Sequence, residues 1–441
     1  MQINPTVTSI PEIKEKDNSL GWFGIIRLGL VQTSIGAIVV MTTSTLNRIM
    51  VVELALPALI PGLLVALHYI VQMIRPRMGF ASDQGHAKTP WILGGMFVLG
   101  LGGIGASIGT ALMGSYFTLG LFISVVAFSL IGVGVSIGGT SLLALLAKSV
   151  NDQKRAAAAT IVWIMMIFGF AITSVMIGKF IDPYSPMKVI TIAGVVSIVA
   201  ILISSIALYR LESGVQSYFK RTQELAQDKM PFKEAFNALW QDPDIRHFTK
   251  FIFISMLAFS SQDLILEPFA GIVFQYTVGQ TTSLSGIQHS GVLLGMILVA
   301  LAGSTSLRKN FGSLNQWIVY GCLASAIAML GLAIAGVFGI GWPLQLNVFL
   351  LGVANGAFSI AAIGSMMRLA VADGVGKEGV RIGLWGGAQA IAFGLGGLLG
   401  AVASDITKVL MTEIASAYSI VFAIEAALFI VAMRYAMGIK K

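Results

Sequence analysis

Twelve runs of mainly apolar residues, each long enough to cross a lipid bilayer, constrain this chain more than any other feature. A membrane-spanning helix needs about 20 such residues. The runs cover approximately residues 27–47, 57–75, 91–112, 117–147, 156–181, 187–209, 248–275, 284–306, 315–337, 343–371, 381–403 and 414–437. In lipid every backbone polar group must be satisfied within the protein, so runs of this length favour helices. We therefore expect an all-α integral membrane protein with twelve transmembrane helices.

The composition excludes the other broad protein classes. Hydrophobic residues make up 56% of the 441 residues and charged residues only 11%, whereas a soluble domain is about one quarter charged. This hydrophobicity excludes intrinsic disorder. A disulfide-stapled fold is excluded because the chain has one cysteine, Cys322, which we expect to pack in an apolar run. Residues 1–26 lack the apolar core of a signal peptide and are interpreted as a cytosolic arm.

The positions of lysine and arginine predict the orientation of the bundle. With both termini inside, the outer loops contain only Arg48, Lys179, Lys188 and Lys408, which leaves 24 of the 28 basic residues at the inner side. This bias is a positive-inside pattern and predicts an N-in, C-in topology. The formal net charge of +8 then reflects topology and contact with anionic membrane lipid. We therefore expect no nucleic-acid partner.

The longest polar stretch, residues 211–247, divides the spans into two groups of six. We expect a six-helix half over residues 27–210, a cytosolic central loop over 211–247, a second half over 248–437 and a short tail over 438–441. An offset of 220 residues places Gly132 and Val133 beside Gly352 and Val353. Two parallel six-helix repeats are typical of the major facilitator architecture, in which the ligand site lies between the halves near the midplane.

The first inner loop also favours this architecture. The stretch Arg75–Lys88, RPRMGFASDQGHAK, resembles the facilitator loop pattern of a glycine, an acid four residues later, and then basic residues, matched by Gly79, Asp83 and Lys88. Glycine permits a tight turn, and the aspartate can cap a helix or pair with a basic group in one conformer. We interpret Arg75, Arg77, Gly79, Asp83 and Lys88 as a conformational motif. A plain helix-capping loop is the alternative.

Span seven carries acidic residues inside an apolar run. In SQDLILEPFAG, residues 261–271, Asp263 and Glu267 are four apart and so share one helix face. Intramembrane acids usually face a cavity or a partner, and Pro268 frees a carbonyl one turn back, which predicts a broken or kinked helix. We interpret Gln262, Asp263 and Glu267 as a polar site for a ligand, a proton or a basic side chain. A structural hydrogen-bonded knot at the kink is the alternative.

Two of the four histidines lie in apolar spans. His68 is in span two, with Gln72 one turn later, and His289 is in span eight. A neutral imidazole can ligate the magnesium of a chlorophyll-type ring, and Gly286 and Gly291 would leave space for a flat macrocycle beside His289. The alternative for each histidine is an ordinary hydrogen-bonded interior residue. We expect no other metal site, because the sequence contains no HExxH motif and no Cys/His cluster.

Polar residues also cluster at the outer end of span one. They are Asn47, Arg48 and Glu53. Pairing of Arg48 with Glu53 or with Asp263 would reduce the free-energy penalty of each buried charge. Snorkelling of Arg48 to the membrane surface is the alternative.

Together these stretches resemble the PucC/LhaA family, the bacteriochlorophyll-delivery branch of the major facilitator superfamily. The likeness runs over nearly the whole chain, and its most specific parts are RLGLVQ (residues 27–32), RPRMGFASD (75–83), the 262–271 stretch and GVLLGM (291–296). The resemblance implies a role in assembling photosynthetic light-harvesting complexes. The protein would deliver (bacterio)chlorophyll to antenna apoproteins, insert it, or chaperone the apoproteins.

The same resemblance implies the partners and the location. The partners would be antenna apoproteins, membrane lipid, (bacterio)chlorophyll or a precursor as bound cargo, and the synthase of that pigment. The location would be a bacterial inner membrane, whether cytoplasmic, intracytoplasmic or thylakoid. The candidate cargo-binding residues are Gln262, Asp263, Glu267, His289 and His68.

Two other functional classes are weighed against this one. A secondary transporter of a small solute or lipid would use Asp263 and Glu267 as a proton-coupling pair. A pigment-synthesis enzyme would need aspartate-rich magnesium sites for a diphosphate, and the nearest sequence is Asp242-Pro243-Asp244. We therefore expect no enzyme activity. The sequence contains no glycine-rich loop ending in Lys-Ser or Lys-Thr, so we do not expect an ATP-driven pump.

Overall fold

A computed structural model describes residues 19–75, 87–212, 240–302, 313–371, 378–411 and 413–439, and these residues form helices and connecting turns without a strand. The first half contains α1 (Trp22–Val40), η1 (Met41–Thr45), α2 (Leu46–Arg48), η2 (Ile49–Glu53), α3 (Leu59–Val71), η3 (Gln72–Ile74), α5 (Thr89–Met113), α6 (Phe117–Ser149), α7 (Asp152–Ile181) and α8 (Pro186–Leu208). The second half contains α11 (Pro243–Ser261), η5 (Gln262–Leu264), α12 (Leu266–Val273), α13 (Val278–Ala302), α15 (Leu314–Phe338), η6 (Gly339–Gly341), α16 (Leu344–Val371), α17 (Glu378–Leu410) and α18 (Ile414–Met437).

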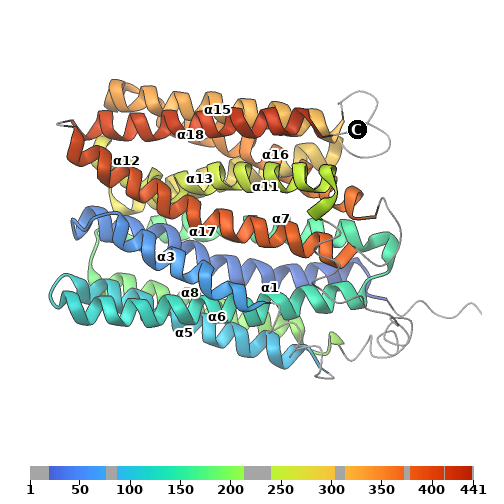
Figure 1. Ribbon diagram of the computed structural model, residues 1–441. Helices are drawn as coiled ribbons and strands as arrows, with labels where there is room; N and C mark the ends of the chain where they lie inside the picture. Colours follow the sequence, from blue (N-terminus) through green and yellow to red (C-terminus); the bar gives the residue numbers. More distant parts are fainter. Residues whose placement is uncertain are drawn as a thin grey trace, which may run out of the picture.

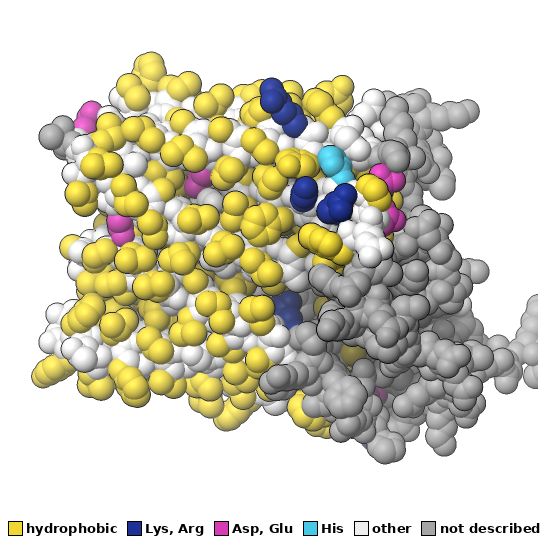
Figure 2. Space-filling model, in the orientation of Figure 1, with side chains coloured by type: hydrophobic (Ala, Val, Ile, Leu, Met, Phe, Trp, Pro, Cys, Tyr) yellow, Lys and Arg dark blue, Asp and Glu magenta, His cyan; other side chains and the backbone are white. Residues whose placement is uncertain are grey.

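The helices have the length and composition of membrane spans. Within the described ranges, 11 helices are long and apolar enough to cross a membrane, and the shorter apolar helix Leu59–Ile74 occupies the position of the second predicted span. The predicted all-α multi-pass membrane protein is therefore confirmed. Figure 2 shows the resulting surface, in which hydrophobic side chains cover most of one face of the bundle.

Two helices begin inside segments that the sequence analysis assigned to the arm and to the central loop. The helix that starts at Trp22 lies partly within the predicted arm, and it continues through two π-helical segments to Glu53. Helix α11 begins at Pro243, inside the predicted central loop, because the Asp242 side chain accepts hydrogen bonds from the Asp244 and Ile245 backbone N–H groups. An aspartate cap followed by proline is a strong helix start. Residues 1–18 and 213–239 lie outside the described residues.

The two halves lie side by side (Figure 1). Two corresponding helix–helix contacts join them. Helix α7 of the first half packs against α13 of the second, and α17 of the second half packs against α3 of the first. These are the fifth and eighth spans and the eleventh and second spans, so the two contacts correspond in the two repeats. We call the end of the bundle that contains Trp22 and Met437 the terminal end, and the end that contains Glu53 and Asp405 the far end.

A glycine in each half supports the predicted repeat. A Cβ added to Gly132 of α6 would lie 2.7 Å from the carbonyl oxygen of His68, and one added to Gly352 of α16 would lie 2.1 Å from that of Gln288. Both glycines therefore allow the fourth span of a half to pack closely against its second span. The alignment of Gly132 with Gly352 thus joins residues with the same structural role.

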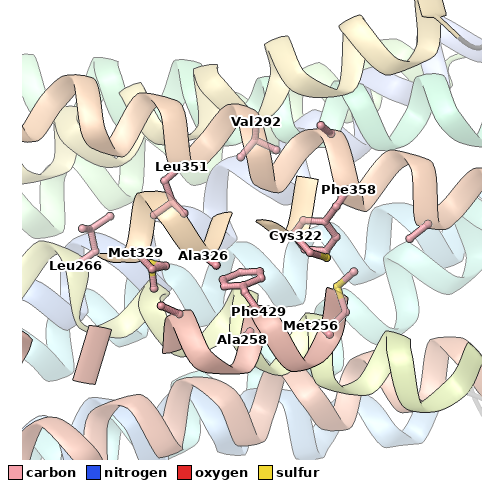
Figure 3. Close-up of a cluster of buried hydrophobic side chains, with 14 of the residues drawn as sticks. Met256, Ala258, Leu266, Val292, Cys322, Ala326, Met329, Leu351, Phe358 and Phe429 are labelled. Carbon is pink, nitrogen blue, oxygen red and sulfur yellow. The ribbon is translucent and has the colours of Figure 1, made fainter. Parts of the chain in front are cut away.

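The second half has a continuous apolar core. Phe429 of α18 lies among Phe358, Cys322 and Met256, which come from three other helices (Figure 3). Cys322 is fully buried and free, as the prediction that it packs requires. This core packs the helices of the second half together around the break in span seven.

Candidate functional site

Span seven is broken where the sequence analysis expected it to break. Helix α11 ends at Ser261, the 3-10 segment η5 follows, and α12 begins at Leu266. Pro268 has no N–H to donate to the carbonyl of Leu264, four residues earlier. That carbonyl instead accepts a hydrogen bond of 2.8 Å from the Asn47 side-chain amide. The break therefore creates a polar contact between the two halves.

Glu267 forms a second polar contact between the halves. The hydroxyl of Ser44, in the π-helical segment η1, donates to Glu267 Oε1, and the same hydroxyl lies 2.9 Å from that of Ser285 on α13. Glu267 is only 1% exposed, and its Oε2 atom has no partner in the described structure. The carboxylate thus joins η1, α12 and α13 and keeps one acceptor atom free.

Asp263 has different neighbours from Glu267, although the two residues were predicted to share one helix face. Ile265, between them, has a φ of −109° and interrupts the helix. Asp263 is partly exposed, and no described residue hydrogen-bonds it. The structure therefore does not bring Asp263 and Glu267 into one hydrogen-bonded cluster.

Arg48 is buried inside the long first span. Its guanidinium forms an ion pair with Glu53 and donates a hydrogen bond of 2.9 Å to the carbonyl oxygen of Tyr276 in the second half. The side chain of Arg48 is 3% exposed and that of Glu53 is 31% exposed. The predicted Arg48–Glu53 pair is therefore confirmed. Snorkelling of Arg48 and its pairing with Asp263 are wrong, because the buried guanidinium is already engaged at the far end.

His68 is a hydrogen-bonded interior residue. Its Nε2 lies 2.8 Å from the Gln72 amide nitrogen, and the Gln72 oxygen accepts a hydrogen bond from Arg75. The residue is 2% exposed, and its ring contacts that of Tyr69 edge-on. Its Nε2 is thus occupied by a neighbour, whereas its buried Nδ1 has no partner in the described structure.

His289 has a more open geometry. Its Nδ1 lies 2.8 Å from the carbonyl oxygen of Ser285, and its partly exposed ring contacts Phe170 edge-on. The tautomer that donates this bond carries its proton on Nδ1, which leaves the Nε2 lone pair for a ligand. A backbone-anchored imidazole is the usual arrangement of a metal-ligating histidine. His289 therefore fits magnesium ligation better than His68 does.

The glycines beside His289 do not leave space for a macrocycle, contrary to the prediction. A Cβ on Gly286 would lie 2.6 Å from Val175 Cγ2 of α7, and one on Gly291 would lie 2.3 Å from the Phe349 carbonyl oxygen of α16. Neighbouring helices fill the space that the missing side chains leave. Both glycines serve close helix packing, so a flat ring ligated by His289 would have to approach from another side.

Most of the predicted inner-loop motif falls outside the described residues, including Arg77, Gly79 and Asp83. At the C-terminal end of the motif, the backbone N–H groups of Lys88 and Thr89 donate to the two carboxylate oxygens of Glu212, at 2.6 and 2.9 Å. Glu212 therefore caps α5. The sequence analysis missed this residue, because it follows the sixth span at a distance in sequence that no short motif covers.

Two further acids were also missed, and both join the halves at the far end. Asp182, after α7, accepts hydrogen bonds from the Thr277 hydroxyl and from the Gly279 N–H, the latter at 3.0 Å, at the start of α13. Asp405, near the end of α17, accepts hydrogen bonds from Ala58 N–H at 3.0 Å and Leu59 N–H at 2.8 Å at the start of α3. Each half therefore caps a helix of the other with an aspartate.

Several buried polar atoms near the break lack a partner in the described structure. They include both amide atoms of Gln262, the Asn47 oxygen and both oxygens of Glu425. Native proteins leave few such atoms unpaired, and each one calls for a water, an ion, a proton or a ligand. The middle of the bundle thus retains unused hydrogen-bonding capacity. Among the residues with assigned positions, no group of three or more His, Cys, Asp or Glu side chains could hold a metal ion.

Comparison with known proteins identifies the family. The family described as PUCC protein matches residues 45–441. The chain belongs to the PucC family. A Rhodobacter capsulatus relative, the bacteriochlorophyll synthase 44.5 kDa chain, is 46% identical over 422 residues, 96% of each chain. A second relative from that organism, Protein PucC, is 29% identical over 95% of this chain and 92% of its own length.

Solved structures show the fold of this PucC-family chain. A POT family transporter in complex with 5-aminolevulinic acid superimposes with a TM-score of 0.69 at 14% identity, over 96% of this chain and 98% of its own. A D-xylose-proton symporter gives the same TM-score at 12% identity, over 95% and 97% of the two chains. The predicted major facilitator-like fold, with two six-helix halves, is therefore confirmed.

Proposed function

We propose that this PucC-family protein is an assembly factor for photosynthetic light-harvesting complexes. It would deliver (bacterio)chlorophyll to antenna apoproteins, insert the pigment, or chaperone the apoproteins in the membrane. The supporting observation is the family match over residues 45–441, together with a relative named as a chain of bacteriochlorophyll synthase. That name also supports the synthase of the pigment as a partner. The fold of solute transporters supports handling of the pigment without chemical conversion, so the proposed role is not enzymatic.

The proposed setting is a bacterial inner membrane, with both termini and the central loop in the cytosol. The described Arg27, Arg246, Lys250 and Arg434 lie in helix turns near the terminal end, and Figure 2 shows lysine and arginine side chains toward that end of the visible face. Basic residues are enriched on the cytosolic side of membrane proteins. The terminal end would therefore face the cytosol.

The proposed cargo site combines an apolar surface with a few polar atoms. Chlorophylls carry a magnesium ion, ring carbonyls and an apolar tail, so a carrier needs a hydrophobic wall and a small number of placed polar groups. His289 Nε2 would ligate the magnesium. Gln262, Asp263 and Glu267 would supply hydrogen-bonding atoms at the break in span seven. Antenna helices would dock against the lipid-facing wall of the bundle.

An absorption spectrum tests the proposal most directly. The protein would be purified with mild detergent from a pigment-producing host. A red-region band of a bound tetrapyrrole, with antenna polypeptides in the same fraction, is the expected result. Purified protein without pigment or antenna polypeptides would contradict the proposed function.

A histidine pair tests the ligand assignment separately. His289→Leu removes the imidazole with the free Nε2 and should abolish the tetrapyrrole band. His68→Leu removes an imidazole whose Nε2 already contacts Gln72 and should leave the band in place. Retention of pigment by both variants would reject His289 as the ligand without rejecting the assembly role.

A secondary transporter of a small solute or lipid is the second candidate. The observation in its favour is the fold shared with a proton symporter. This alternative predicts uptake of a solute into vesicles that an uncoupler abolishes, and no pigment in the purified protein.

A further inference from the structure

Two exposed cations, Arg246 and Lys250, lie in the first two turns of α11 at the terminal end of the bundle. The residues are four apart, so they share one side of the helix. Figure 2 shows lysine, arginine and histidine side chains near one another toward this end of the visible face. We call Arg246 and Lys250 the α11 basic pair. It concentrates positive charge on the surface of a single helix.

The start of a helix tolerates positive charge poorly. The N-terminal end of a helix carries a partial positive charge, so a cation in its first turn is unfavourable, and Arg246 is the fourth residue of α11. Two like charges four residues apart on a helix also repel each other. Basic residues that only determine topology can lie in loops, where neither effect arises. Both effects act against the α11 basic pair, and a bound anion would relieve both.

The described part of the protein supplies no such anion. The ion pair found among the described residues is Arg48–Glu53, at the far end. Asp242 is engaged as the N-cap of α11. Asp244 precedes Arg246 by two residues, which places it on the opposite side of the helix. The α11 basic pair therefore has no carboxylate partner among the described residues.

The surroundings of the α11 basic pair are those of a membrane surface. Helix α18 packs against α11, and its exposed side carries Ile424, Val431 and Met437 toward the terminal end. Trp240, just before α11, is 42% exposed, and tryptophan is enriched where membrane and water meet. This arrangement places the pair where the apolar surface of the bundle meets the headgroup region of the bilayer.

A contact with α18 fixes the helix beneath the pair. The Nε2 atom of His247, which follows Arg246, lies 2.7 Å from the carbonyl oxygen of Tyr435, and the centroids of the His247 and Tyr435 rings are 5.3 Å apart. A Cβ added to Gly438 would lie 2.6 Å from the same Nε2, so the two helices are in close contact here. These turns of α11 are held in place before a ligand arrives, which lowers the entropic penalty of binding.

We propose that the α11 basic pair binds the phosphate group of an anionic phospholipid. The planar guanidinium of Arg246 can donate two parallel hydrogen bonds to phosphate oxygens, and the Lys250 ammonium adds a second positive charge one turn away. The acyl chains lie along the apolar surface of α18 beside the pair. Free phosphate would meet the two cations but leave the apolar side chains uncovered, so the lipid fits the surroundings better. The site goes beyond the proposed function, because it stands whether the protein handles pigment or a solute.

Native mass spectrometry of the full chain in mild detergent tests the proposal, with phosphatidylglycerol and phosphatidylcholine of equal acyl chains as probes. The native protein should bind phosphatidylglycerol more tightly. Arg246→Gln/Lys250→Gln should weaken this binding about 30-fold, because each basic residue near an anionic lipid contributes about fivefold. Arg246→Lys/Lys250→Arg keeps both charges and should retain the preference. Lys179→Gln/Arg434→Gln, which removes two exposed cations from separate helices, should bind as the native protein does.

Thermal unfolding gives a second measurement, whose outcome a purely structural role would not reproduce. Without anionic lipid, Arg246→Gln/Lys250→Gln should unfold at the native temperature or above it, because the repulsion between the two cations is gone. Added phosphatidylglycerol should raise the unfolding midpoint of the native protein and leave that of the variant unchanged.

Several results would overturn the site. Equal binding of the two lipids by the native protein means that no headgroup is recognised, and equal losses in the two glutamine double variants mean that only net charge matters. Destabilisation of Arg246→Gln/Lys250→Gln without lipid means that the pair serves the fold. Displacement of phosphatidylglycerol by inorganic phosphate would assign the site to free phosphate, and binding of a glutamate-rich peptide in place of the lipid would assign it to an acidic protein partner.

Discussion

Hydrogen bonding distinguishes the buried polar residues of this bundle from one another. Arg48 and His68 are bonded to near neighbours, although Arg48 Nε and His68 Nδ1 have no partner in the described structure. Glu267 keeps one free carboxylate oxygen and Glu425 keeps two. A buried group whose bonds are complete stabilises the fold, and one with spare capacity is available for a ligand or a proton. The two glutamates that keep free carboxylate oxygens lie on spans seven and twelve.

Glu267 allows the role of a hydrogen bond to be separated from that of a charge. Glu267→Leu removes the acceptor of the Ser44 hydroxyl and should reduce stability by about 1–3 kcal/mol, the penalty for a broken buried hydrogen bond. Glu267→Gln retains an oxygen that can accept from Ser44, so its effect should be smaller. The midpoint of thermal unfolding in detergent measures both. Equal losses in the two variants would show that the charge, and not the hydrogen bond, stabilises the contact.

The sequence revealed the acids of this site but not their partners. Asp263, Glu267 and Pro268 are conspicuous in an apolar run, and the break they predicted is present. Ser44 and Ser285 could not be recognised, because serines are common in membrane helices and usually bond to their own backbone. The split between Asp263 and Glu267 depends on a local turn at Ile265, which residue spacing does not determine.

Among the elements, α13 is closely packed against a helix on each side. Gly286 faces α7, and Gly291 and Gly295 face α16, where an added Cβ at Gly295 would lie 2.1 Å from the Val353 carbonyl oxygen. The helix therefore joins the first half to the core of the second through backbone contacts. The sequence analysis interpreted Gly286 and Gly291 as space for a ligand, since a glycine in a sequence does not indicate whether a helix or a ligand fills the gap.

A pair of glycine variants tests this packing. Gly291→Ala should force α13 and α16 apart, because its Cβ would lie 2.3 Å from a backbone oxygen, and overpacking of this kind costs about 1–3 kcal/mol. Gly94→Ala, on the exposed side of α5 with no neighbour within 4 Å, should be neutral or stabilising by up to about 1 kcal/mol. Unfolding midpoints compare the two. A Gly291→Ala protein as stable as the Gly94→Ala protein would contradict the close contact.

For the whole molecule, aspartate caps at the far end connect the halves. Asp405→Ala should free the amides at the start of α3, and Asp182→Ala those at the start of α13. Losing a helix cap costs about 1 kcal/mol, which corresponds to about fivefold faster exchange. Hydrogen–deuterium exchange with mass spectrometry would detect each effect locally.

Asp242→Ala is the matched control for these caps. It removes an aspartate cap from α11 at the terminal end, within one half. Exchange at the starts of α3 and α13 should remain at the native rate in this variant. Unchanged exchange in the Asp182 and Asp405 variants as well would show that their caps do not hold the halves together.

The orientation in the membrane remains a prediction from charge and can be measured on intact cells. In a Cys322→Ser background, Ser115→Cys places an exposed thiol at the far end and Gln241→Cys one at the terminal end. An impermeant maleimide added outside the inner membrane should label Ser115→Cys only. Labelling of Gln241→Cys alone would reverse the N-in, C-in assignment.

The overall architecture was predictable to a greater extent than the connections within it. Apolar runs and a central polar stretch determine twelve spans and two halves, since lipid leaves the backbone few alternatives. The acids that join the halves are different, because Asp182 and Asp405 look like ordinary loop residues in the sequence. Their roles depend on which helix start lies beside them in space, which requires the three-dimensional arrangement.

The aspartate caps that each half provides for a helix of the other also bear on the origin of the chain. In a symmetric dimer of identical subunits, any contact that one subunit makes with its partner occurs twice, once in each direction. Asp182 caps α13 of the second half, and Asp405 caps α3 of the first half. These two caps reproduce that pattern inside a single polypeptide. An ancestral six-helix protein would have needed one acid and one helix start to close both sides of a homodimer. Tandem duplication of its gene would then have joined the subunits without requiring a new interface.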